Sequence, residues 1–347
     1  AEPATVVTTE ATQRRVAGLF VVEERGPEML KGVREPVTLY RVVQPSGMRS
    51  RLDVAAGHLT RFIGREVELA TLVDRWQRAQ DGEGQNVLVL GEAGVGKSRL
   101  VYQLHEHLAA VPHTWLECGA TPYTEGTPFH PVVALATQAL AFTPEDTAAA
   151  QLGKLEVGLR TLASAETVAL LADFLGLPPP TPPLQMSPEL QRRKTMAFLA
   201  QWTLSLSAAQ PLVLFVEDLH WCDASSLELL GRIIAQSATA RVLFVATARP
   251  ELTPPWPARS NLTTLQLARL TKRQAREMIA AVAGQRRQAG TPAPPGQEKD
   301  SEKESNGVAQ ASPPAHLISG AVIDALVARA DGVPLYVEEL TKAVAEP

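Results

Sequence analysis

Residues 91–98 read Gly-Glu-Ala-Gly-Val-Gly-Lys-Ser, and this segment restricts the fold more than any other part of the sequence. It follows an apolar run at 86–90 and opens a helical pattern, which is the context of a phosphate-binding loop. The glycines let the backbone turn its N–H groups inward around a phosphate, and the following helix adds the positive end of its dipole. We therefore expect Lys97 to approach the β and γ phosphates of a nucleotide and Ser98 to ligate magnesium.

The segments around this loop predict a parallel sheet. Several runs are apolar throughout, and helical patterns separate them. The apolar runs cover 86–90, 212–216 and 242–246, and the helical patterns cover 65–80, 97–110 and 191–208. Strands that are apolar on both faces are typical of parallel sheets with helices on both sides. The sequence therefore predicts an α/β fold, namely the parallel sheet of a P-loop NTPase covered by helices on both faces.

Polar side chains stand directly after two of these runs. Glu217 and Asp218 follow 212–216, and Arg249 follows 242–246 at the same edge of a parallel sheet. Because successive side chains diverge at a strand end, one carboxylate can face the metal and the other the attacking water. If the metal-facing acid comes first, Glu217 holds magnesium and Asp218 polarises water, but the order stays open. Arg249 is placed to sense a γ-phosphate.

The overall composition excludes several other classes of protein. Hydrophobic residues make up 45% of the 347 residues and charged residues 20%, as in ordinary globular proteins. The 33 basic and 37 acidic residues leave a net charge of −4, which gives no general electrostatic reason to bind nucleic acid or an acidic membrane. No apolar run approaches the ~18 residues of a membrane span. Cys118 and Cys222 lack the spacing of a disulfide scaffold, so we expect a cytoplasmic protein.

Several further motifs accompany the phosphate loop in a fixed order. They are Phe-Ile-Gly-Arg-Glu-x-Glu-Leu at 62–69, Glu-Asp-Leu-His-Trp-Cys-Asp at 217–223, Thr-Ala-Arg at 247–249 and Asp-Gly-Val-Pro-Leu at 331–335. Together they resemble the STAND class of AAA-like signal-transduction ATPases. More narrowly, they resemble the ATPase module that follows class III nucleotide cyclase domains in bacterial regulators. The resemblance covers about 59–347.

This resemblance implies a set of site residues. The nucleotide-binding residues would be Phe62, Gly64, Arg65, Gly91, Gly94, Val95, Gly96, Lys97, Ser98, Arg99 and Pro334. The catalytic residues would be Lys97, Glu217, Asp218 and Arg249, and the metal ligands Ser98, Glu217 and Asp218. Segment 62–66 would lie near the adenine, and Pro334 would belong to a helical lid that closes over the base. Many members begin the acidic pair with Asp rather than Glu, so we expect slow hydrolysis here.

The acidic pair is followed by His220, Trp221 and Cys222. His220 either reports on the nucleotide state or caps the neighbouring helix, and both interpretations stay open. We expect Trp221 to pack against a neighbouring helix. Cys222 is expected to fill a small apolar space in the core.

The first 45 residues form a separate zone. Apolar, β-prone runs at 16–22 and 37–43 predict two strands joined near 26–27 or at Gly32. The segments 30–37 and 40–42 resemble the last strands of a class III nucleotide cyclase domain, whose catalytic residues lie upstream in that family. We therefore expect the end of such a domain, without cyclase activity of its own, in a longer polypeptide.

The sequence thus predicts four zones. They are a cyclase-domain remnant at 1–45, a linker at 46–58, a P-loop ATPase domain at 59–268 and a helical lid at 269–347. Within the lid, residues 284–316 contain Val308 but no Leu, Ile or aromatic residue. Burial cannot offset the ordering entropy of such a segment, so we expect an unstructured insertion.

These observations favour a regulatory ATPase that binds ATP and Mg²⁺ and hydrolyses ATP slowly. One alternative is a fragment of an adenylate or guanylate cyclase fusion protein, and another is a P-loop small-molecule kinase. The expected partners are ATP and ADP, together with a protein partner or a second copy bound through flanking domains. We see no helix-turn-helix with a basic recognition face, and no partner that is a nucleic acid or a membrane is expected.

Overall fold

The computed structural model describes most of the chain. The described residues are 5–15, 20–30, 32–33, 36–45, 59–124, 126–159, 164–178, 185–290 and 319–345. They divide into two units, Ala1–Arg61 and Phe62–Pro347. The predicted linker at 46–58 lies outside the described residues.

The first unit is a small antiparallel sheet. Strand β3 (Val37–Pro45) lies between β1 (Val6–Thr9) and β2 (Phe20–Glu28), and helix α1 (Glu10–Arg15) follows β1. The sequence predicted β3, but the run predicted at 16–22 overlaps only the start of β2, and residues 16–19 lie outside the described part of the chain. Neither β1 nor α1 was predicted, because four and six residues are too few for a periodic pattern.

The turn between β2 and β3 lies at Gly32 and not at Gly26. Gly26 stands within β2, opposite Leu39, at an irregularity of the strand register. Leu39 is the one buried hydrophobic side chain in the described part of this unit, whereas Val6, Met29 and Val43 are at least half exposed. A sheet that buries so little apolar surface is only marginally stable by itself.

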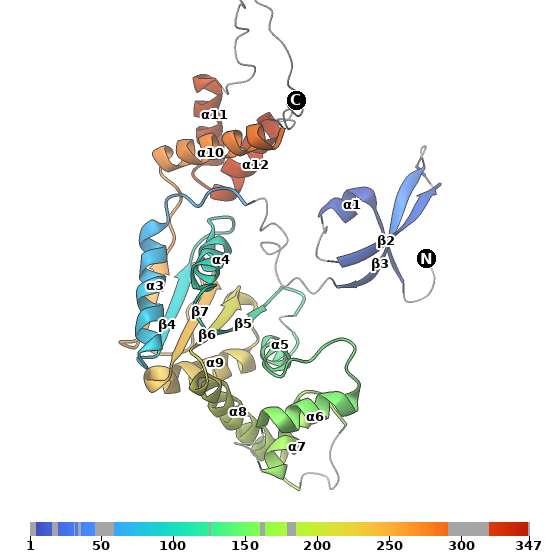
Figure 1. The fold of residues 1–347 in the computed structure, drawn as a ribbon, viewed down its shortest axis with the longest axis vertical. Coiled ribbons are helices and arrows are strands. Elements are labelled where there is room, and N and C mark those ends of the chain that lie inside the picture. The colour runs from blue at the N-terminus through green and yellow to red at the C-terminus, as the bar shows by residue number, and fades with distance from the viewer. Residues whose placement is uncertain are drawn as a thin grey trace, which may run out of the picture. The chain divides into compact units, whose positions relative to one another are not determined.

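The second unit is built on five parallel strands in the order β5-β6-β7-β4-β8 (Figure 1). The strands are β4 (Gln85–Leu90), β5 (Thr114–Gly119), β6 (Leu212–Glu217), β7 (Val242–Ala248) and β8 (Leu262–Gln266). The predicted parallel sheet is confirmed. Strand β8 was not predicted, because its side chains are half-buried or exposed and give no apolar run.

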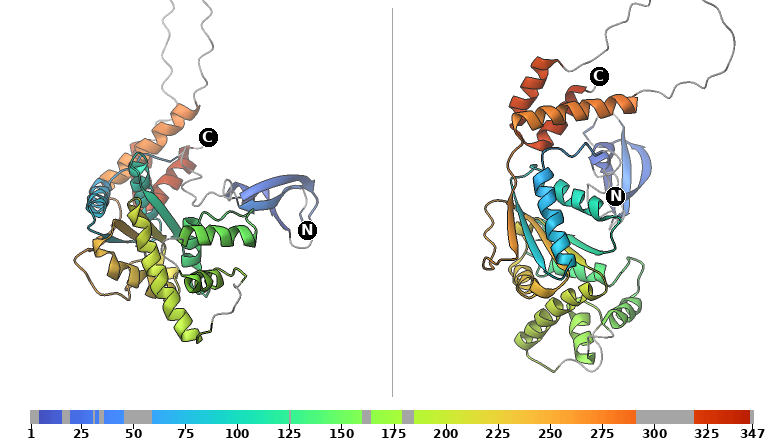
Figure 2. Two further views of the ribbon diagram at one scale, coloured as in Figure 1. Left: turned by 60° about the horizontal axis from the view of Figure 1, so that its bottom comes forward. Right: turned by 60° about the vertical axis from the view of Figure 1, so that its left-hand side comes forward.

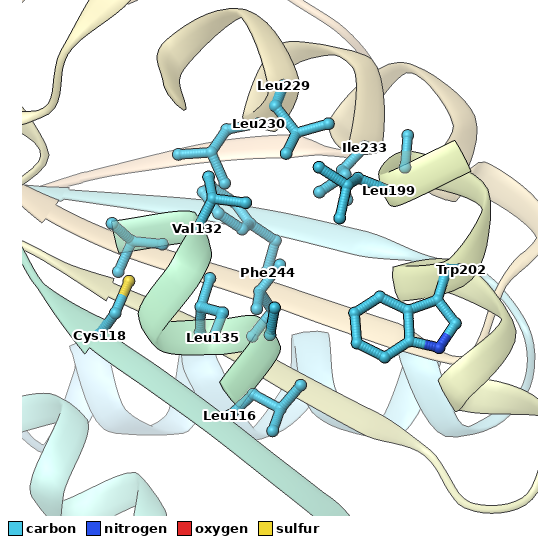
Figure 3. Packing of buried hydrophobic residues seen from close by; sticks show 14 of the residues in the cluster. Leu116, Cys118, Val132, Leu135, Leu199, Trp202, Leu229, Leu230, Ile233 and Phe244 are labelled. Carbon is cyan, nitrogen blue, oxygen red and sulfur yellow. The ribbon is translucent and has the colours of Figure 1, made fainter. Parts of the chain in front are cut away.

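Helices cover both faces of this sheet (Figures 1 and 2). Helices α3 (Glu66–Gln80) and α4 (Lys97–Leu108) pack on one face. Helices α5 (His130–Ala139), α8 (Pro188–Ser205) and α9 (Ala224–Gln236) pack on the other. Figure 3 shows side chains of α5, α8 and α9 meeting on that second face.

Alternation along the strands divides the core into two hydrophobic clusters. In β6, Val213 and Phe215 belong to the cluster under α3 and α4. Leu214 and Val216 of the same strand belong to the cluster under α5, α8 and α9. All six residues of β6 except the last are buried, so no polar side chain interrupts the strand before Glu217.

Two further groups of helices complete the unit. Helices α6 (Ala148–Leu159) and α7 (Ala165–Phe174) lie between α5 and α8 in the sequence and were not predicted. Helices α10 (Lys272–Gly290), α11 (Gly320–Ala330) and α12 (Pro334–Ala345) form the helical region at the C-terminal end (Figure 2). Ile63 belongs to the hydrophobic cluster of these helices. None of the described helices combines the length and apolarity that crossing a bilayer requires.

The start of the unstructured insertion was predicted too early in the sequence. Helix α10 continues through Gly290, so the prediction for 284–290 is wrong. Gln, Arg and Ala are good helix formers, and adding residues to an existing helix costs little once its amphipathic part has packed. Residues 291–316 lie outside the described part of the chain.

The burial of the sheet under helices on both faces leads to a prediction about stability. Leu214 is fully buried, so Leu214→Ala should lower the free energy of unfolding of this unit by about 3 kcal/mol through lost burial and a cavity. Chemical denaturation followed by circular dichroism measures the change. Val157→Ala on α6, where the side chain is exposed, is the control and should change the free energy by less than about 0.5 kcal/mol. Similar values for the two variants would contradict the packing described here.

Candidate functional site

The phosphate loop joins β4 to α4 and is shaped by its glycines. Gly94 and Gly96 have φ angles of 76° and 98°, which residues with side chains rarely adopt. A Cβ atom added to Gly91 would lie 2.7 Å from Cγ1 of Val95, whereas one added to Gly96 would meet no atom within 4 Å. The loop is therefore closely packed at its start and open beside Gly96.

The side chain of Lys97 is buried against this loop. Its ammonium group donates hydrogen bonds to the carbonyl oxygens of Gly91, at 2.9 Å, and Glu92, at 3.1 Å. Burial lowers the pKa of Lys97, the charge of Asp218 raises it, and Arg249 lowers it again. The predicted phosphate-binding cation is thus held at the loop, in the electrostatic field of the predicted acid and the predicted sensor.

Ser98 and Glu217 meet beside the loop, although they lie far apart in the sequence. The Ser98 hydroxyl donates a hydrogen bond to Oε1 of Glu217 at the end of β6. Burial raises the pKa of Glu217, and the hydrogen bond from Ser98 lowers it. A hydroxyl and a carboxylate are the hard oxygen ligands that Mg²⁺ takes in combination with phosphates. The donor set therefore fits the predicted metal.

Asp218 lies at the point where β6 ends and the short 3₁₀ helix Leu219–Trp221 begins. Its φ is 55°, in the left-handed region, and its amide donates a hydrogen bond to Oγ1 of Thr247 at 3.0 Å. Nδ1 of His220 lies 4.0 Å from Oδ1 of Asp218. Burial lowers the pKa of His220, and the charge of Asp218 raises it.

The motif that follows the acids is largely structural. Asp223 caps α9, because its carboxylate accepts hydrogen bonds from the amides of Ser225 and Ser226 at 3.0 and 3.1 Å. The same carboxylate accepts the amide of Phe129, which precedes α5, at 3.1 Å. Of the two interpretations of His220, the helix cap does not hold for α9, because Asp223 occupies the N-cap and no described residue forms a hydrogen bond with the His220 ring. A response of His220 to the nucleotide state stays a prediction.

Arg249 and Trp221 lie together at the rim of the sheet. The guanidinium carbon of Arg249 is 5.5 Å from the centre of the Trp221 ring. Trp221 and Cys222 pack on the hydrophobic cluster under α9, as predicted. A cation–π contact of this kind orients the arginine without consuming its hydrogen-bond donors, which stay available to an anion.

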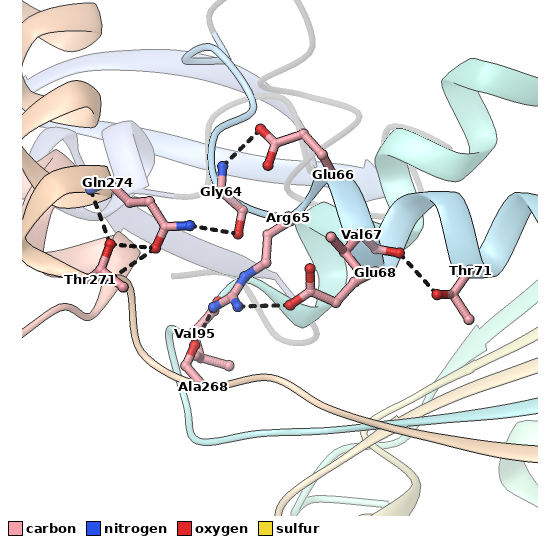
Figure 4. Close-up of polar contacts among 10 residues, drawn as sticks. All are labelled: Gly64, Arg65, Glu66, Val67, Glu68, Thr71, Val95, Ala268, Thr271 and Gln274. Carbon is pink, nitrogen blue, oxygen red and sulfur yellow. Dashed lines mark hydrogen bonds and ion pairs between the residues drawn. The ribbon is translucent and has the colours of Figure 1, made fainter.

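Arg65 connects three separate segments behind the phosphate loop (Figure 4). Its guanidinium donates hydrogen bonds to Glu68 on α3 at 3.1 Å, to the carbonyl of Val95 at 3.3 Å, and to the carbonyl of Ala268 after β8. The resemblance implied a nucleotide contact for Arg65, and that contact stays a prediction. The bridge to Val95 is a function that the sequence did not reveal, because its partners lie 30 and 203 residues away.

The bond from Arg65 to Val95 also orients the loop. In a trans peptide, the C=O of one residue and the N–H of the next point in opposite directions. Because Arg65 holds the Val95 carbonyl on the protein side, the amide of Gly96 is directed to the other side. Oriented amides of this kind form the anion-binding concavity of a phosphate loop.

The helical region contacts the loop at Gly94, next to the residue that Arg65 holds. The amide of Leu335, next to Pro334 at the start of α12, donates a hydrogen bond to the Gly94 carbonyl at 3.3 Å. A Cβ atom at Gly94 would lie 3.1 Å from Val333 and 3.2 Å from Leu335. The predicted lid segment 332–334 therefore lies beside the phosphate loop, which places Pro334 at the candidate nucleotide site.

Arg269 forms an additional bridge that the sequence did not reveal. Its guanidinium donates to Oε2 of Glu92 in the loop, at 2.7 and 3.1 Å, and pairs with Asp331 at the end of α11. The amide of Leu270 donates to the Gly332 carbonyl at 2.7 Å. These side chains are exposed, so the ion pairs contribute little to stability. They lie where the C-terminal helical region meets the loop.

For the other residues predicted to bind the nucleotide, the structure shows only contacts within the protein. Phe62 packs on the cluster under α3 and α4. Gly64 has a φ of 72°, and its carbonyl accepts a hydrogen bond from Gln274 of α10 at 3.4 Å. Arg99 lies on α4 with its guanidinium 5.4 Å from the Tyr102 ring, and burial lowers its pKa. Their contacts with a nucleotide stay predictions.

The sheet, the loop after β4 and the acids after β6 define this unit as a P-loop NTPase. The family model of the AAA ATPase domain matches residues 61–245. The chain therefore belongs to the AAA ATPase domain family and is a nucleotide-binding ATPase module.

An uncharacterised protein of Rhizobium meliloti (strain 1021) is 29% identical over 287 residues, which cover 80% of this chain and 27% of that protein. The chain thus spans about a quarter of that relative's length. Among solved structures, a RuvB variant from Thermotoga maritima has a TM-score of 0.41 and 16% identity, covering 82% of this chain and 62% of that one. A STAND protein with a tetratricopeptide repeat sensor from Pyrococcus horikoshii has a TM-score of 0.33 and 14% identity, covering 66% and 26%.

The Arg65 bridge leads to a prediction about stability. Arg65→Met removes a buried cation and leaves two carbonyls and the Glu68 carboxylate without that donor, so unfolding should become easier by about 3 kcal/mol. Arg78→Met is the matched control, because Arg78 pairs with Glu83 at an exposed site and should change stability by less than about 1 kcal/mol. Urea unfolding followed by circular dichroism compares the two. Equal losses of unfolding free energy in Arg65→Met and Arg78→Met would show that the buried bridge stabilises the protein no more than an exposed ion pair does.

Proposed function

We propose that this chain binds ATP with Mg²⁺, hydrolyses it slowly and serves as a nucleotide-dependent regulatory switch. The observation that carries the proposal is the meeting of Ser98 and Glu217 beside an open glycine loop whose lysine is buried. This arrangement combines a cation for the phosphates, oxygen ligands for a metal and a row of main-chain amides. The adenine preference rests on the resemblance to STAND ATPases.

Each residue at the rim is assigned a role in this proposal. The contact between Ser98 and Glu217 supports Glu217 as the acid that faces the metal. Asp218, with its side chain about two-fifths exposed, is then the acid that orients water. When bound, Mg²⁺ would neutralise charge on the phosphates. Arg249 would contact the γ-phosphate and so distinguish triphosphate from diphosphate.

The switch rests on contacts that the lid and the phosphate loop share. Leu335 holds the carbonyl of Gly94, and Arg269 joins Glu92 in the loop to Asp331 in the lid. A ligand shifts such an arrangement only when it interacts differently with the two states. Pro334 and Arg249 are the residues through which a triphosphate and a diphosphate would differ.

The rest of the molecule is assigned by resemblance. We propose that the first unit is the last part of a class III cyclase domain, with 59–268 as the ATPase domain and 269–347 as the lid. The larger size of the Rhizobium relative supports a longer parent protein. A protein partner or a second copy would bind through the flanking domains, in the cytoplasm. Phosphate release measured with and without small-molecule acceptors separates this ATPase from a kinase.

Substitution of Lys97 tests nucleotide binding directly. Lys97→Ala removes the buried ammonium, so the affinity for Mg-ATP should fall at least about tenfold in isothermal titration calorimetry. Lys194→Ala is the control, because Lys194 forms an exposed ion pair with Glu166 on a distant helix and should leave affinity unchanged. Equal affinity of Lys97→Ala and the unaltered chain would refute the site.

Neutralising Glu217 and Asp218 separately tests which acid faces the metal and which orients the water. Glu217→Gln should weaken the dependence of ATP affinity on Mg²⁺, because it removes the charge beside Ser98. Asp218→Asn should preserve Mg-ATP binding within about threefold while lowering phosphate release at least about tenfold, as for loss of a group that orients water. Titrations with and without Mg²⁺ and single-turnover assays give both quantities. The reverse pattern would exchange the two roles.

A further inference from the structure

The two acids at the end of β6 should not face the same side. Successive side chains of a strand point to opposite faces of the sheet. Val213 and Phe215 point to the face of α3 and α4, and the contact with Ser98 places Glu217 on that face as well. A regular continuation of β6 would therefore send Asp218 to the opposite face, beside Leu214 and Val216 and away from the phosphate loop.

The backbone breaks this alternation at Asp218. Its φ and ψ are 55° and 48°, so the chain leaves the extended conformation at this residue. Aspartate tolerates this left-handed region better than most residues, but it rarely adopts it without support. Asp218 therefore does not continue the alternation that would send its side chain away from the phosphate loop.

Thr247 supplies the support. The register pairs Phe215 with Val245 and Val216 with Ala246, so that Thr247 on β7 stands beside the end of β6. Val245 belongs to the cluster under α3 and α4, and Thr247, two residues later, shares that face. Its side chain is fully buried, and its hydroxyl accepts the amide of Asp218 at 3.0 Å.

Packing alone does not explain why position 247 is a threonine. The neighbouring residues of β7 are apolar and buried, and valine would fill the same volume without a polar atom. The hydroxyl instead gives the Asp218 amide a partner at the position where the ladder between β6 and β7 ends. An amide at a partly buried position is costly to leave without a partner, so this bond stabilises the turned conformation.

We propose that Thr247 is a positioning residue of the ATPase site, whose hydroxyl holds the amide of Asp218 at the end of β6 so that both carboxylates face the phosphate loop. The inference rests on the proposed function, because it assigns Asp218 to the attacking water. It concerns the support of an acid and not a contact with the nucleotide. Arg249, two residues later and just past the end of β7, keeps its separate proposed role at the γ-phosphate.

Thr247→Val and Thr247→Ser test this proposal in the full chain. Valine keeps the shape and removes the hydroxyl, whereas serine keeps the hydroxyl. Thr263→Val is the matched control, because Thr263 is half-buried in β8 of the same sheet, away from the acids. Amide hydrogen exchange resolved to Asp218 is measured without nucleotide, and Mg-ATP affinity and single-turnover phosphate release are measured separately.

We expect the Asp218 amide to exchange at least about tenfold faster in Thr247→Val than in the unaltered chain, because its acceptor is lost. Mg-ATP affinity should stay within about threefold, and phosphate release should fall at least about tenfold. Thr247→Ser should restore both exchange protection and turnover, and Thr263→Val should change neither. Combining Thr247→Val with Asp218→Asn should lower turnover no further than Asp218→Asn alone, because both act through one group.

Other outcomes overturn the inference. Unchanged exchange or unchanged turnover in Thr247→Val would show that the hydroxyl does not position Asp218, and failure of serine to rescue would assign the effect to packing. An unaltered chain that binds Mg-ATP without any turnover would remove the role of Asp218 and the inference with it. An unaltered chain that binds no Mg-ATP would instead refute the proposed function.

Discussion

The burial of β4, β6 and β7 on both faces is the constraint on which the rest of the structure depends. Inside such strands every backbone polar group is paired by the ladder, and a charged side chain would be costly. Charged chemistry is therefore confined to the ends of the strands. Glu217 is the first charged residue of β6, and Arg249 follows β7 directly. Parallel pairing then brings these positions and the loop after β4 to one edge.

At that edge, several side chains form hydrogen bonds with backbone groups. Arg65 holds the carbonyl of Val95, Thr247 holds the amide of Asp218, and Asp223 holds the amides that open α9. Each of these bonds satisfies a polar group at the place where a strand, loop or helix leaves its regular pattern. These bonds set in place the loop, the acid and the helix that surround the candidate nucleotide site.

Local patterns explain how much of this could be predicted from the sequence. The phosphate loop, the acids after 212–216 and the two-sided sheet were predictable, because each is a contiguous signal. Thr247 and Arg269 were missed in these roles because their partners are distant in sequence and are brought near only by strand pairing and helix packing. Strand β8 was missed because an edge strand of five half-exposed residues lacks an apolar run. The end of helix α10 was missed because the helix continues past its apolar part, where good helix formers extend it.

The contacts between the C-terminal helical region and the phosphate loop are of two different kinds. The bridge from Arg269 to Glu92 and Asp331 is exposed, so salt screens it and it contributes little to closure. The bond from Leu335 to Gly94 joins backbone atoms at a close approach of Val333 and Leu335 to the glycine. A change in the loop conformation at Gly94 would disturb this bond and the packing at the start of α12. In the switch proposed above, this contact is the more direct connection between the loop and α12.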